Sequence, residues 1–429
     1  MADAAPRLHA LVQQLLGAPF PMRVRAWDGS LAGPPDAPTL VVRNRRAIRR
    51  LLFKPGELGL ARAWVSGDLD VEGDLYQALD LISGQVWHRD DHARSLTEAL
   101  RDPGFRAAVR GLLMLAGPPL PPAPPPEEVR RTTHLHTRHS DRRAISHHYD
   151  VGNDFYEIVL GPSMVYSCAY WESADSTLED AQRDKLELVC RKLALTPGQR
   201  LLDVGCGWGS MAIHAAREHE VSVVGITLSQ EQATYARKRV ADAGLTDRVE
   251  IRVQDYRDVA DGPYDAISSI GMAEHVGADK YLEYAGVLHA LLKPGGRLLN
   301  HQIARRPHRD ETAYEINEFI DAYVFPDGEL APLGSTVTQL ERAGFEVRDV
   351  ESIREHYALT LRRWVSRLED DWSRAVQLTS AGRARVWRLY MAASALAFEH
   401  RRIGVNQVLA VRTPPSGASG LPLRSRTWN

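Results

Sequence analysis

The sequence has very little cysteine, and the cysteines it has are scattered. Only three, Cys168, Cys190 and Cys206, occur in 429 residues, and their spacing does not match the paired ligands of a zinc motif. Three cysteines also cannot build a disulfide framework, which suits a reducing compartment. We therefore expect a cytoplasmic protein without structural disulfides.

Long apolar runs and an excess of one charge are also absent. No run approaches the roughly 20 residues that a membrane span needs, and the N-terminus lacks the charged and apolar stretches of a signal peptide. The net charge of −2 gives no overall basic field for nucleic acid. Hydrophobic residues make up 44% and charged residues 25%, as in soluble globular proteins. Any membrane contact is therefore expected to be peripheral.

Proline is concentrated in one stretch, GPPLPPAPPPEE at 117–128. A run this rich in proline builds neither a helix nor a paired strand, so it predicts an extended, semi-rigid linker. We place this linker at 116–135, between a smaller N-terminal α/β domain at 1–115 and a larger domain at 136–429. In the smaller domain TLVVR (39–43) predicts a strand and RAIRRLLFK (46–54) a helix.

The segment that follows the linker, 130–150, is dense in arginine and histidine. One interpretation is a solvated charged segment. The other is a local cationic face for anionic lipid headgroups, because each arginine near an anionic surface contributes about 1 kcal/mol. The arginines concerned are Arg130, Arg131, Arg138, Arg142 and Arg143. A metal site is less expected, because His134, His136 and His139 have no evident partners that would fix their geometry.

From about residue 199, short apolar strands alternate with amphipathic helices. This alternation predicts an α/β fold with a parallel sheet covered on both faces. The predicted strands are RLLDVG, VSVVGIT, VEIRVQD, YDAISSIG and GRLLNHQI, with helices up to about 218, at 229–243 and at 278–292. Farther on, Leu361, Trp364, Val365, Leu368 and Trp372 recur at helical spacing and are expected in the core.

A glycine-rich turn, LLDVGCGWGS at 201–210, closes the first of these strands and opens a helix. Such a turn lets the backbone approach a ligand closely at the carboxyl end of a sheet. Its spacing is G-x-G-x-G and not the G-x-G-x-x-G of dinucleotide binders. The second strand ends in VVGITLS (223–229), which offers no acidic residue to a nicotinamide ribose. Both features favour S-adenosylmethionine as the ligand.

Six short motifs occur along the chain in this order: HYDVGNDFY, YSCAYW, LDVGCGWG, GITLSQEQ, IGMAEHVG and HYALTL. The motifs and their order resemble those of cyclopropane-fatty-acyl-phospholipid synthases and mycolic acid cyclopropane synthases. The resemblance covers roughly 140–413 and implies a Rossmann-like, S-adenosylmethionine-dependent methyltransferase domain. The N-terminal segment is more loosely similar to the extra domain of phospholipid-acting members. Actinobacterial relatives that make methylene-branched acyl chains share the same motifs.

The resemblance implies which residues bind S-adenosylmethionine. Thr227 and Gln232 take the place of the missing acidic ribose ligand, and Asp255 and Tyr256 are the expected neighbours of adenine. The full set is Tyr166, Ser167, Asp203, Gly205, Gly207, Thr227, Leu228, Gln232, Asp255, Tyr256, Ile270 and Gly271.

The resemblance also implies the chemistry. A methyl group adds to the cis double bond of an acyl chain in a membrane phospholipid, and a base deprotonates the resulting carbocation to give a cyclopropane or a methylene branch. In the family that base is a bound bicarbonate ion, held here by the side chains of Glu274, His301 and Tyr357 and by the backbone at Cys168 and Ile303. A thiolate would consume the cation, so Cys168 is expected to act through its backbone and small size. Taken singly, Glu274 could instead cap a helix, His301 could be a satisfied core histidine, and Tyr357 could be a packing aromatic.

Other features leave alternatives open. The stretch 305–332 is either an ordinary packed helix and turn or a lid over an acyl tunnel, and the resemblance favours the lid. The expected partners are unsaturated phospholipids at the inner face of the membrane, with a reductase needed only for a methylene product and a homodimer left open. The rival functions are a soluble small-molecule S-adenosylmethionine methyltransferase and a catalytically inactive lipid-binding protein.

Overall fold

The structure is a computed structural model, and the chain divides into two compact units. The first comprises 1–131, 317–324 and 380–396, and the second comprises 132–316, 325–379 and 397–429. The described residues are 3–86, 101–129, 151–311, 314, 316–326, 328–424 and 426. The basic segment predicted to contact lipid, with His134, His136 and His139, lies outside the described residues.

A seven-stranded sheet in the order β10-β11-β9-β8-β5-β6-β7 forms the centre of the second unit. The strands from β9 to β7 in this order run parallel, which confirms the predicted α/β fold. Two strands that the sequence did not predict, β10 and β11, extend this sheet: β11 returns from the C-terminal helices and pairs antiparallel with both β9 and β10. The strands are β5 (Arg200–Val204), β6 (Ser222–Thr227), β7 (Val249–Val253), β8 (Tyr264–Ile270), β9 (Leu292–Arg305), β10 (Glu346–Ser352) and β11 (Ile403–Val411).

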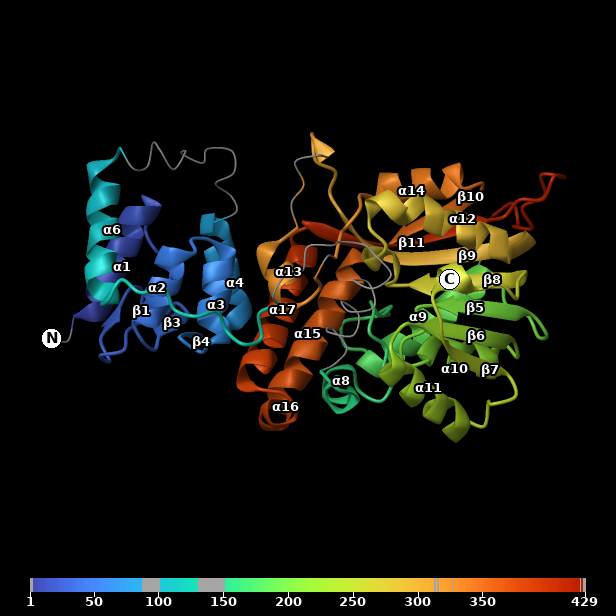
Figure 1. Cartoon of the computed structure of the whole chain (residues 1–429), viewed down its shortest axis with the longest axis horizontal. Helices are drawn as coiled ribbons and strands as arrows, with labels where there is room; N and C mark the ends of the chain where they lie inside the picture. Colours follow the sequence, from blue (N-terminus) through green and yellow to red (C-terminus); the bar gives the residue numbers. More distant parts are fainter. Residues whose placement is uncertain are drawn as a thin grey trace. The chain divides into compact units, whose positions relative to one another are not determined.

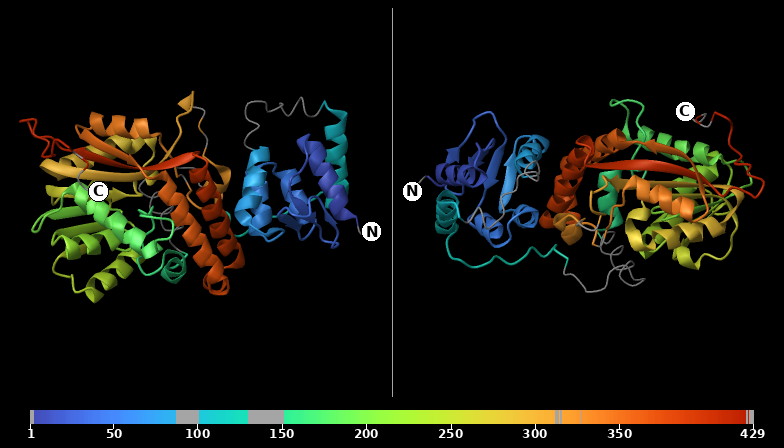
Figure 2. Two further views of the ribbon diagram at one scale, coloured as in Figure 1. Left: turned by 180° about the vertical axis from the view of Figure 1, so that it is seen from behind. Right: turned by 90° about the horizontal axis from the view of Figure 1, so that it is seen from above.

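Helices cover both faces of this sheet (Figures 1 and 2). Successive residues of a strand point to opposite faces, so Leu201 joins a core with α9, α10 and α11, whereas Leu202 joins a core with α12 and α14. The predicted helices at 229–243 and 278–292 are α11 and α12. These helices are α9 (Leu178–Leu193), α10 (Ser210–Glu218), α11 (Gln230–Asp242), α12 (Tyr281–Leu291) and α14 (Leu333–Arg342).

The C-terminal helices follow the predicted apolar pattern with one exception. In α15 (Arg354–Asp370) the side chains of Leu361, Trp364, Val365 and Leu368 are buried, as expected for a core helix. Trp372 is only partly buried, because α15 ends at Asp370 and Trp372 begins the separate helix α16 (Trp372–Leu378). The last helix, α17 (Ala381–Glu399), precedes β11.

The first unit has a four-stranded sheet in the order β2-β1-β3-β4. The predicted strand at 39–43 is β3 (Thr39–Val42), and the predicted helix at 46–54 is α2 (Arg46–Phe53). Residues 117–129 form neither helix nor strand, as predicted for the proline-rich stretch. The other elements are α1 (Ala4–Leu16), β1 (Arg23–Arg25), β2 (Leu31–Ala32), α3 (Glu57–Val65), β4 (Leu69–Glu72), α4 (Leu75–Val86) and α6 (Pro103–Ala116), with α1 and α6 side by side (Figure 1).

The first unit also contains the middle of the stretch predicted as a lid. This part is α13 (Glu318–Tyr323), which packs near α3. The Tyr323 hydroxyl donates to Glu128 Oε2 over 2.9 Å, and Lys54 Nζ lies 2.8 Å from Glu318 Oε1. From Phe325 onward the stretch belongs to the second unit. None of the helices among the described residues has both the length and the apolar character needed to cross a membrane.

Candidate active site

The glycine-rich turn lies between β5 and α10. Gly205, Gly207 and Gly209 have φ angles of 77°, 53° and 80°, in the left-handed region that side chains disfavour. A Cβ at Gly209 would lie 3.2 Å from the Ala236 Cβ atom of α11. Glycine therefore provides both the backbone conformation of this turn and its close approach to the neighbouring helix.

A cavity lies beside the turn, and every residue predicted to bind S-adenosylmethionine lines it. The volume of this cavity is about 130 Å³ when measured as the space open to the centre of a water molecule. On the same scale one water needs only about 10–15 Å³. The cavity is thus large enough for an organic ligand. The binding role of these residues remains a prediction. The further lining residues that the sequence analysis did not identify include Lys185, Gln254, Arg257, Met272, His275 and Lys280.

Hydrogen bonds hold two charged residues of the cavity wall, Lys185 on α9 and Asp203 on β5. Lys185 Nζ donates to Ser167 Oγ over 3.0 Å, and Ser268 Oγ donates to Asp203 Oδ1 over 2.7 Å. The second carboxylate oxygen of Asp203 is buried and has no hydrogen-bond partner among the described residues. Burial raises the pKa of Asp203 to about 6 and lowers the pKa of Lys185 to about 8. The sequence could have pointed to Lys185, because it is a charged residue at a position that the helical pattern of 178–193 places in the core.

The cavity wall also carries the polar residues predicted near ribose and adenine. Thr227 Oγ1 donates to Gln232 Oε1 over 2.8 Å at the end of β6. The Asp255 carboxylate accepts two hydrogen bonds from the Arg257 guanidinium, of 2.8 and 2.6 Å. These contacts hold the polar side chains in place along the cavity wall.

Glu274 and Ile303, two of the predicted catalytic residues, are directly hydrogen-bonded. The Ile303 backbone N–H donates to Glu274 Oε1 over 2.7 Å, while Glu274 Oε2 is buried without a partner among the described residues. The carboxylate is therefore anchored to β9 and does not cap the following helix. Burial is the main cause that raises the pKa of Glu274, to about 7.

His301 lies two residues before Ile303 on β9 and touches the cavity wall through its backbone. Its carbonyl accepts the Gly271 N–H over 2.8 Å, and Ile270 is its partner in the register of β8 with β9. Its Nδ1 lies 3.3 Å from Gln407 Nε2, whereas its Nε2 is buried without a partner among the described residues. Burial, and then the charges of Lys185 and Lys192, keep the pKa of His301 well below its usual value. His301 is thus a neutral imidazole with one unsatisfied ring nitrogen.

A chain of hydrogen bonds joins Cys168 to the start of α15, which carries Tyr357, and to the strands β11 and β9. Cys168 Sγ donates to the Ile353 carbonyl over 3.7 Å, and the Ile353 N–H donates to the Val405 carbonyl over 3.0 Å. Val405 in turn pairs with Ile303. Burial raises the pKa of the Cys168 thiol well above its usual value. This thiol is therefore protonated and hydrogen-bonded, which contradicts a nucleophilic role.

Aromatic rings connect the cavity with Tyr357. The centroid of Tyr166, on the cavity wall, lies 5.4 Å from that of Trp364, and Trp364 lies 6.0 Å from Tyr357. Tyr156 adds a further ring 5.6 Å from Tyr166 and 4.6 Å from Trp208. Aromatic ring faces of this kind can stabilise a nearby positive charge through cation–π interaction.

The end of the predicted lid lies on the loop that carries Glu274. The Glu329 N–H donates to the Glu274 carbonyl over 3.2 Å, and Glu329 Oε2 accepts the Ala278 N–H over 2.9 Å. The Phe325 ring lies 5.6 Å from the ring of His275, which lines the cavity. This part of the stretch therefore covers the Glu274 loop within the second unit.

Residues 136–408 match the model of the protein family described as mycolic acid cyclopropane synthetase. The chain belongs to this family. Over 415 residues it is 46% identical to a probable fatty acid methyltransferase of Mycobacterium tuberculosis, a match that covers 94% of each protein. It is 40% identical to the cyclopropane-fatty-acyl-phospholipid synthase of Escherichia coli over 63% of this chain and 68% of that protein.

Solved structures of family members have the same fold. The cyclopropane synthase MmaA2 from Mycobacterium tuberculosis is 32% identical and superposes with a TM-score of 0.60, covering 65% of this chain and 100% of that one. The mycolic acid cyclopropane synthase CmaA1, in complex with SAH and CTAB, is 33% identical, also with a TM-score of 0.60, covering 63% and 98% of the two chains. The fold class is therefore that of S-adenosylmethionine-dependent methyltransferases of the cyclopropane synthase type.

Proposed function

We propose that this protein transfers the methyl group of S-adenosylmethionine to the cis double bond of an unsaturated acyl chain in a membrane phospholipid. The product is a cyclopropane or a methylene-branched chain. The observation that carries the proposal is that Glu274 Oε2 and His301 Nε2 are buried without a partner among the described residues. Both belong to residues whose neighbours, such as Gly271 and His275, line the glycine-containing cavity. The names of the relatives, which include fatty acid methyltransferases and cyclopropane synthases, support it.

The cavity residues fit S-adenosylmethionine. The turn at Gly205 and Gly207 allows close approach of the backbone, and the unsatisfied Asp203 Oδ2 is an acceptor for an ammonium group. Thr227 and Gln232 offer polar groups to ribose hydroxyls. When bound there, S-adenosylmethionine supplies an electrophilic methyl group, and the residues of the cavity contribute by orienting it.

The second group of residues fits a bicarbonate ion. Because the pKa of Glu274 is about 7, a share of its carboxyl groups is protonated at neutral pH and can donate to an anion. His301 can donate from Nε2. The Ile303 N–H is already donated to Glu274, so Ile303 acts by orienting that carboxyl group. When bound there, bicarbonate supplies the base that removes the proton.

The walls of the site suit an alkene as the substrate. An isolated double bond offers nothing for a base to activate, so positioning carries much of the catalysis. The rings of Tyr166, Trp364 and Tyr357 offer faces to positive charge. No reactive thiolate competes for the cation, because burial keeps Cys168 protonated. We propose that the enzyme reaches this substrate peripherally, at the inner face of the membrane.

The test incubates the purified full chain with S-adenosylmethionine and vesicles of dioleoyl, dielaidoyl or distearoyl phospholipid. We expect S-adenosylhomocysteine to form with the cis-unsaturated lipid, and the acyl chain to gain one CH₂ by mass spectrometry. NMR of the product distinguishes the cyclopropane from the methylene branch. Consumption of the donor without lipid would instead indicate a small-molecule methyltransferase, and no consumption with any lipid would indicate an inactive lipid-binding protein.

A further inference from the structure

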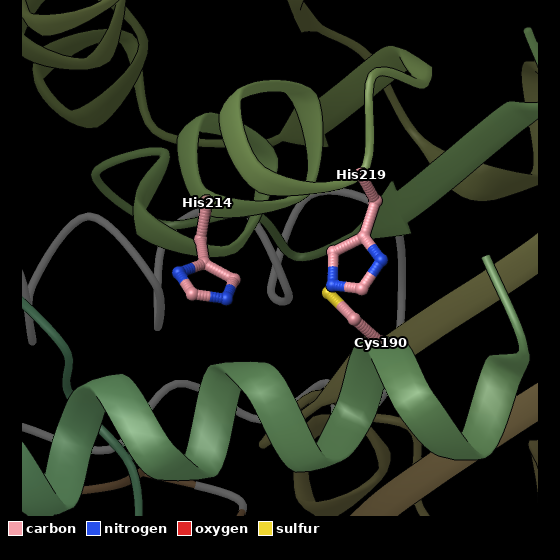
Figure 3. A group of neighbouring side chains, drawn as sticks. All are labelled: Cys190, His214 and His219. Carbon is pink, nitrogen blue, oxygen red and sulfur yellow. The ribbon is translucent and has the colours of Figure 1, made fainter. Parts of the chain in front are cut away.

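A second cluster of ligating side chains lies in the methyltransferase unit, between α9 and α10. It consists of Cys190 on α9, His214 on α10 and His219 just after α10, and one ligand atom of each lies within 4.8 Å of the others. Figure 3 shows both imidazoles on the same side of α9, with a ring nitrogen of His219 directed at the Cys190 sulfur. None of these residues lines the donor cavity.

A carboxylate, that of Glu187, completes the cluster. Glu187 precedes Cys190 by one helical turn of α9, and its Oε2 lies 3.2 Å from His214 Nε2 and 3.0 Å from His219 Nε2. Its other oxygen, Oε1, accepts from Arg191 Nε over 2.8 Å. Arg191 therefore holds the carboxylate with Oε2 turned toward the two imidazoles.

These distances are compatible with tetrahedral coordination. Bonds of about 2.0–2.1 Å from zinc to nitrogen or oxygen place neighbouring ligand atoms about 3.3 Å apart, and the longer bond to sulfur extends this to about 3.6 Å. The Glu187–histidine pairs already lie near the first value. The remaining separations, at most 4.8 Å among Cys190, His214 and His219, require a closure of about 1 Å.

We propose that Cys190, His214, His219 and Glu187 form a binding site for Zn²⁺. A thiolate with two imidazoles selects zinc or another late transition metal over magnesium and calcium, which prefer oxygen ligands. On binding, the Cys190 thiol releases its proton to solvent and its sulfur bonds to the metal. The His214 and His219 side chains are 12% and 18% exposed, so an ion can reach the cluster from solvent.

The site would have a structural effect on the donor cavity. The same helix α9 carries Lys185 and Leu186 into the cavity wall, and α10 carries Ser210 and Met211. A metal ion that joins α9 to α10 therefore holds both sides of this wall together. We expect Zn²⁺ to raise the thermal midpoint of unfolding without taking part in methyl transfer.

The test uses the full chain without a histidine tag, stripped of metal with a chelator. Zn²⁺ is titrated against a chromophoric competitor, and Co²⁺ serves as a spectroscopic probe for thiolate ligation. We expect one ion per chain, with affinity at least tenfold lower in Cys190→Ser and in His219→Gln. His289→Gln, which changes a histidine of the same unit outside the cluster, is the matched control and should bind as the unmodified protein does.

Three results would overturn the proposal. The first is the absence of stoichiometric Zn²⁺ binding by folded, metal-stripped protein. The second is unchanged affinity in both variants, and the third is a thiolate-to-cobalt absorption band that persists in Cys190→Ser. Because Cys190 is fully buried, circular dichroism checks the fold of its variant, and the partly exposed His219 provides an independent test.

Discussion

Gln407 Nε2 lies 3.3 Å from Nδ1 of His301, its partner in the pairing of β11 with β9. Lys192 Nζ, which can only donate, lies 2.8 Å from Gln407 Oε1. This contact fixes the orientation of the amide, so the Gln407 NH₂ group faces His301. Nδ1 of the neutral imidazole must then accept, and Nε2 carries the hydrogen. Lys192 and Gln407 thus make His301 a donor toward the proposed bicarbonate.

The first prediction tests this tautomer with Gln407→Glu. A carboxylate would accept from Nδ1–H and leave Nε2 without its hydrogen, so we expect kcat to fall on the order of 10²–10³-fold with unchanged donor affinity. Nitrogen-15 NMR of labelled histidine should report the altered tautomer. Asn406→Asp adds the same charge on the opposite face of β11 and should not alter the tautomer. Normal turnover with the tautomer unchanged in Gln407→Glu would contradict the assignment.

The second prediction concerns Glu274→Gln and Tyr357→Phe. Each should bind S-adenosylmethionine as the unmodified protein does and lose most of its turnover, on the order of 10²–10³-fold. The reason is that both positions lie in the proposed bicarbonate site and outside the donor cavity. Calorimetric titration with the donor and turnover on dioleoyl phospholipid are the measurements. Near-normal turnover by both variants would rule out these two residues as bicarbonate ligands.

The third prediction follows from the raised pKa of Glu274. Its value rises from 4.5 to about 7 because the carboxyl group is buried, and the neighbouring Tyr281 and Tyr284 stay neutral because burial raises their pKa values. Below about pH 4 the carboxyl group of Glu274 is protonated in both the folded and the unfolded protein, so its contribution to stability is at its maximum. Between about pH 4.5 and 7 the unfolded state loses the proton first, so the contribution of Glu274 to the free energy of unfolding falls, by roughly 3 kcal/mol in total.

Denaturant titrations at pH 5 and pH 8 measure this effect. Glu274→Gln has no ionisable group at this position, so its free energy of unfolding should fall less between the two pH values than that of the unmodified protein. Equal falls in both proteins would show that Glu274 ionises at its ordinary pKa.

The fourth prediction is that Cys168→Ala keeps substantial activity. The thiol is protonated and donates to backbone carbonyls, so removing it should cost about 1 kcal/mol of stability and little turnover. Thiol reagents should inhibit mainly through their bulk. Complete inactivity of a folded, donor-binding Cys168→Ala protein would give the sulfur a chemical role.

The fifth prediction rests on the sequence of the basic segment. Replacing Arg130, Arg131, Arg138, Arg142 and Arg143 with glutamine should weaken binding to anionic vesicles and raise the apparent KM for lipid, with donor affinity unchanged. Attraction between exposed charges weakens as the screening length falls from about 10 Å at 0.1 M salt to about 3 Å at 1 M. Co-sedimentation over a range of salt measures it. If the variant and the unmodified protein sediment equally at every salt concentration, this segment does not dock the enzyme.

The sequence predicted what local patterns encode. The spacing of Gly205, Gly207 and Gly209 gave the turn, and the alternation of strands and helices gave the parallel part of the sheet. The role of Gln407 in orienting His301 could not be predicted from local patterns. The contact joins residues 106 positions apart and depends on the antiparallel register of β11. The position of α13 was likewise unpredictable, because its partners, such as Glu128, lie far away in the sequence.

The continuous strand β9 has a consequence for how this protein can diverge. The His301 side chain meets Gln407, and the Ile303 N–H meets Glu274, in the present register of β9 with β8 and β11. Inserting or deleting one residue before His301 would turn its side chain to the other face of the sheet. Insertions and deletions should therefore be selected against within 297–305 and within the partner strand β11. They should accumulate instead in the surface loops.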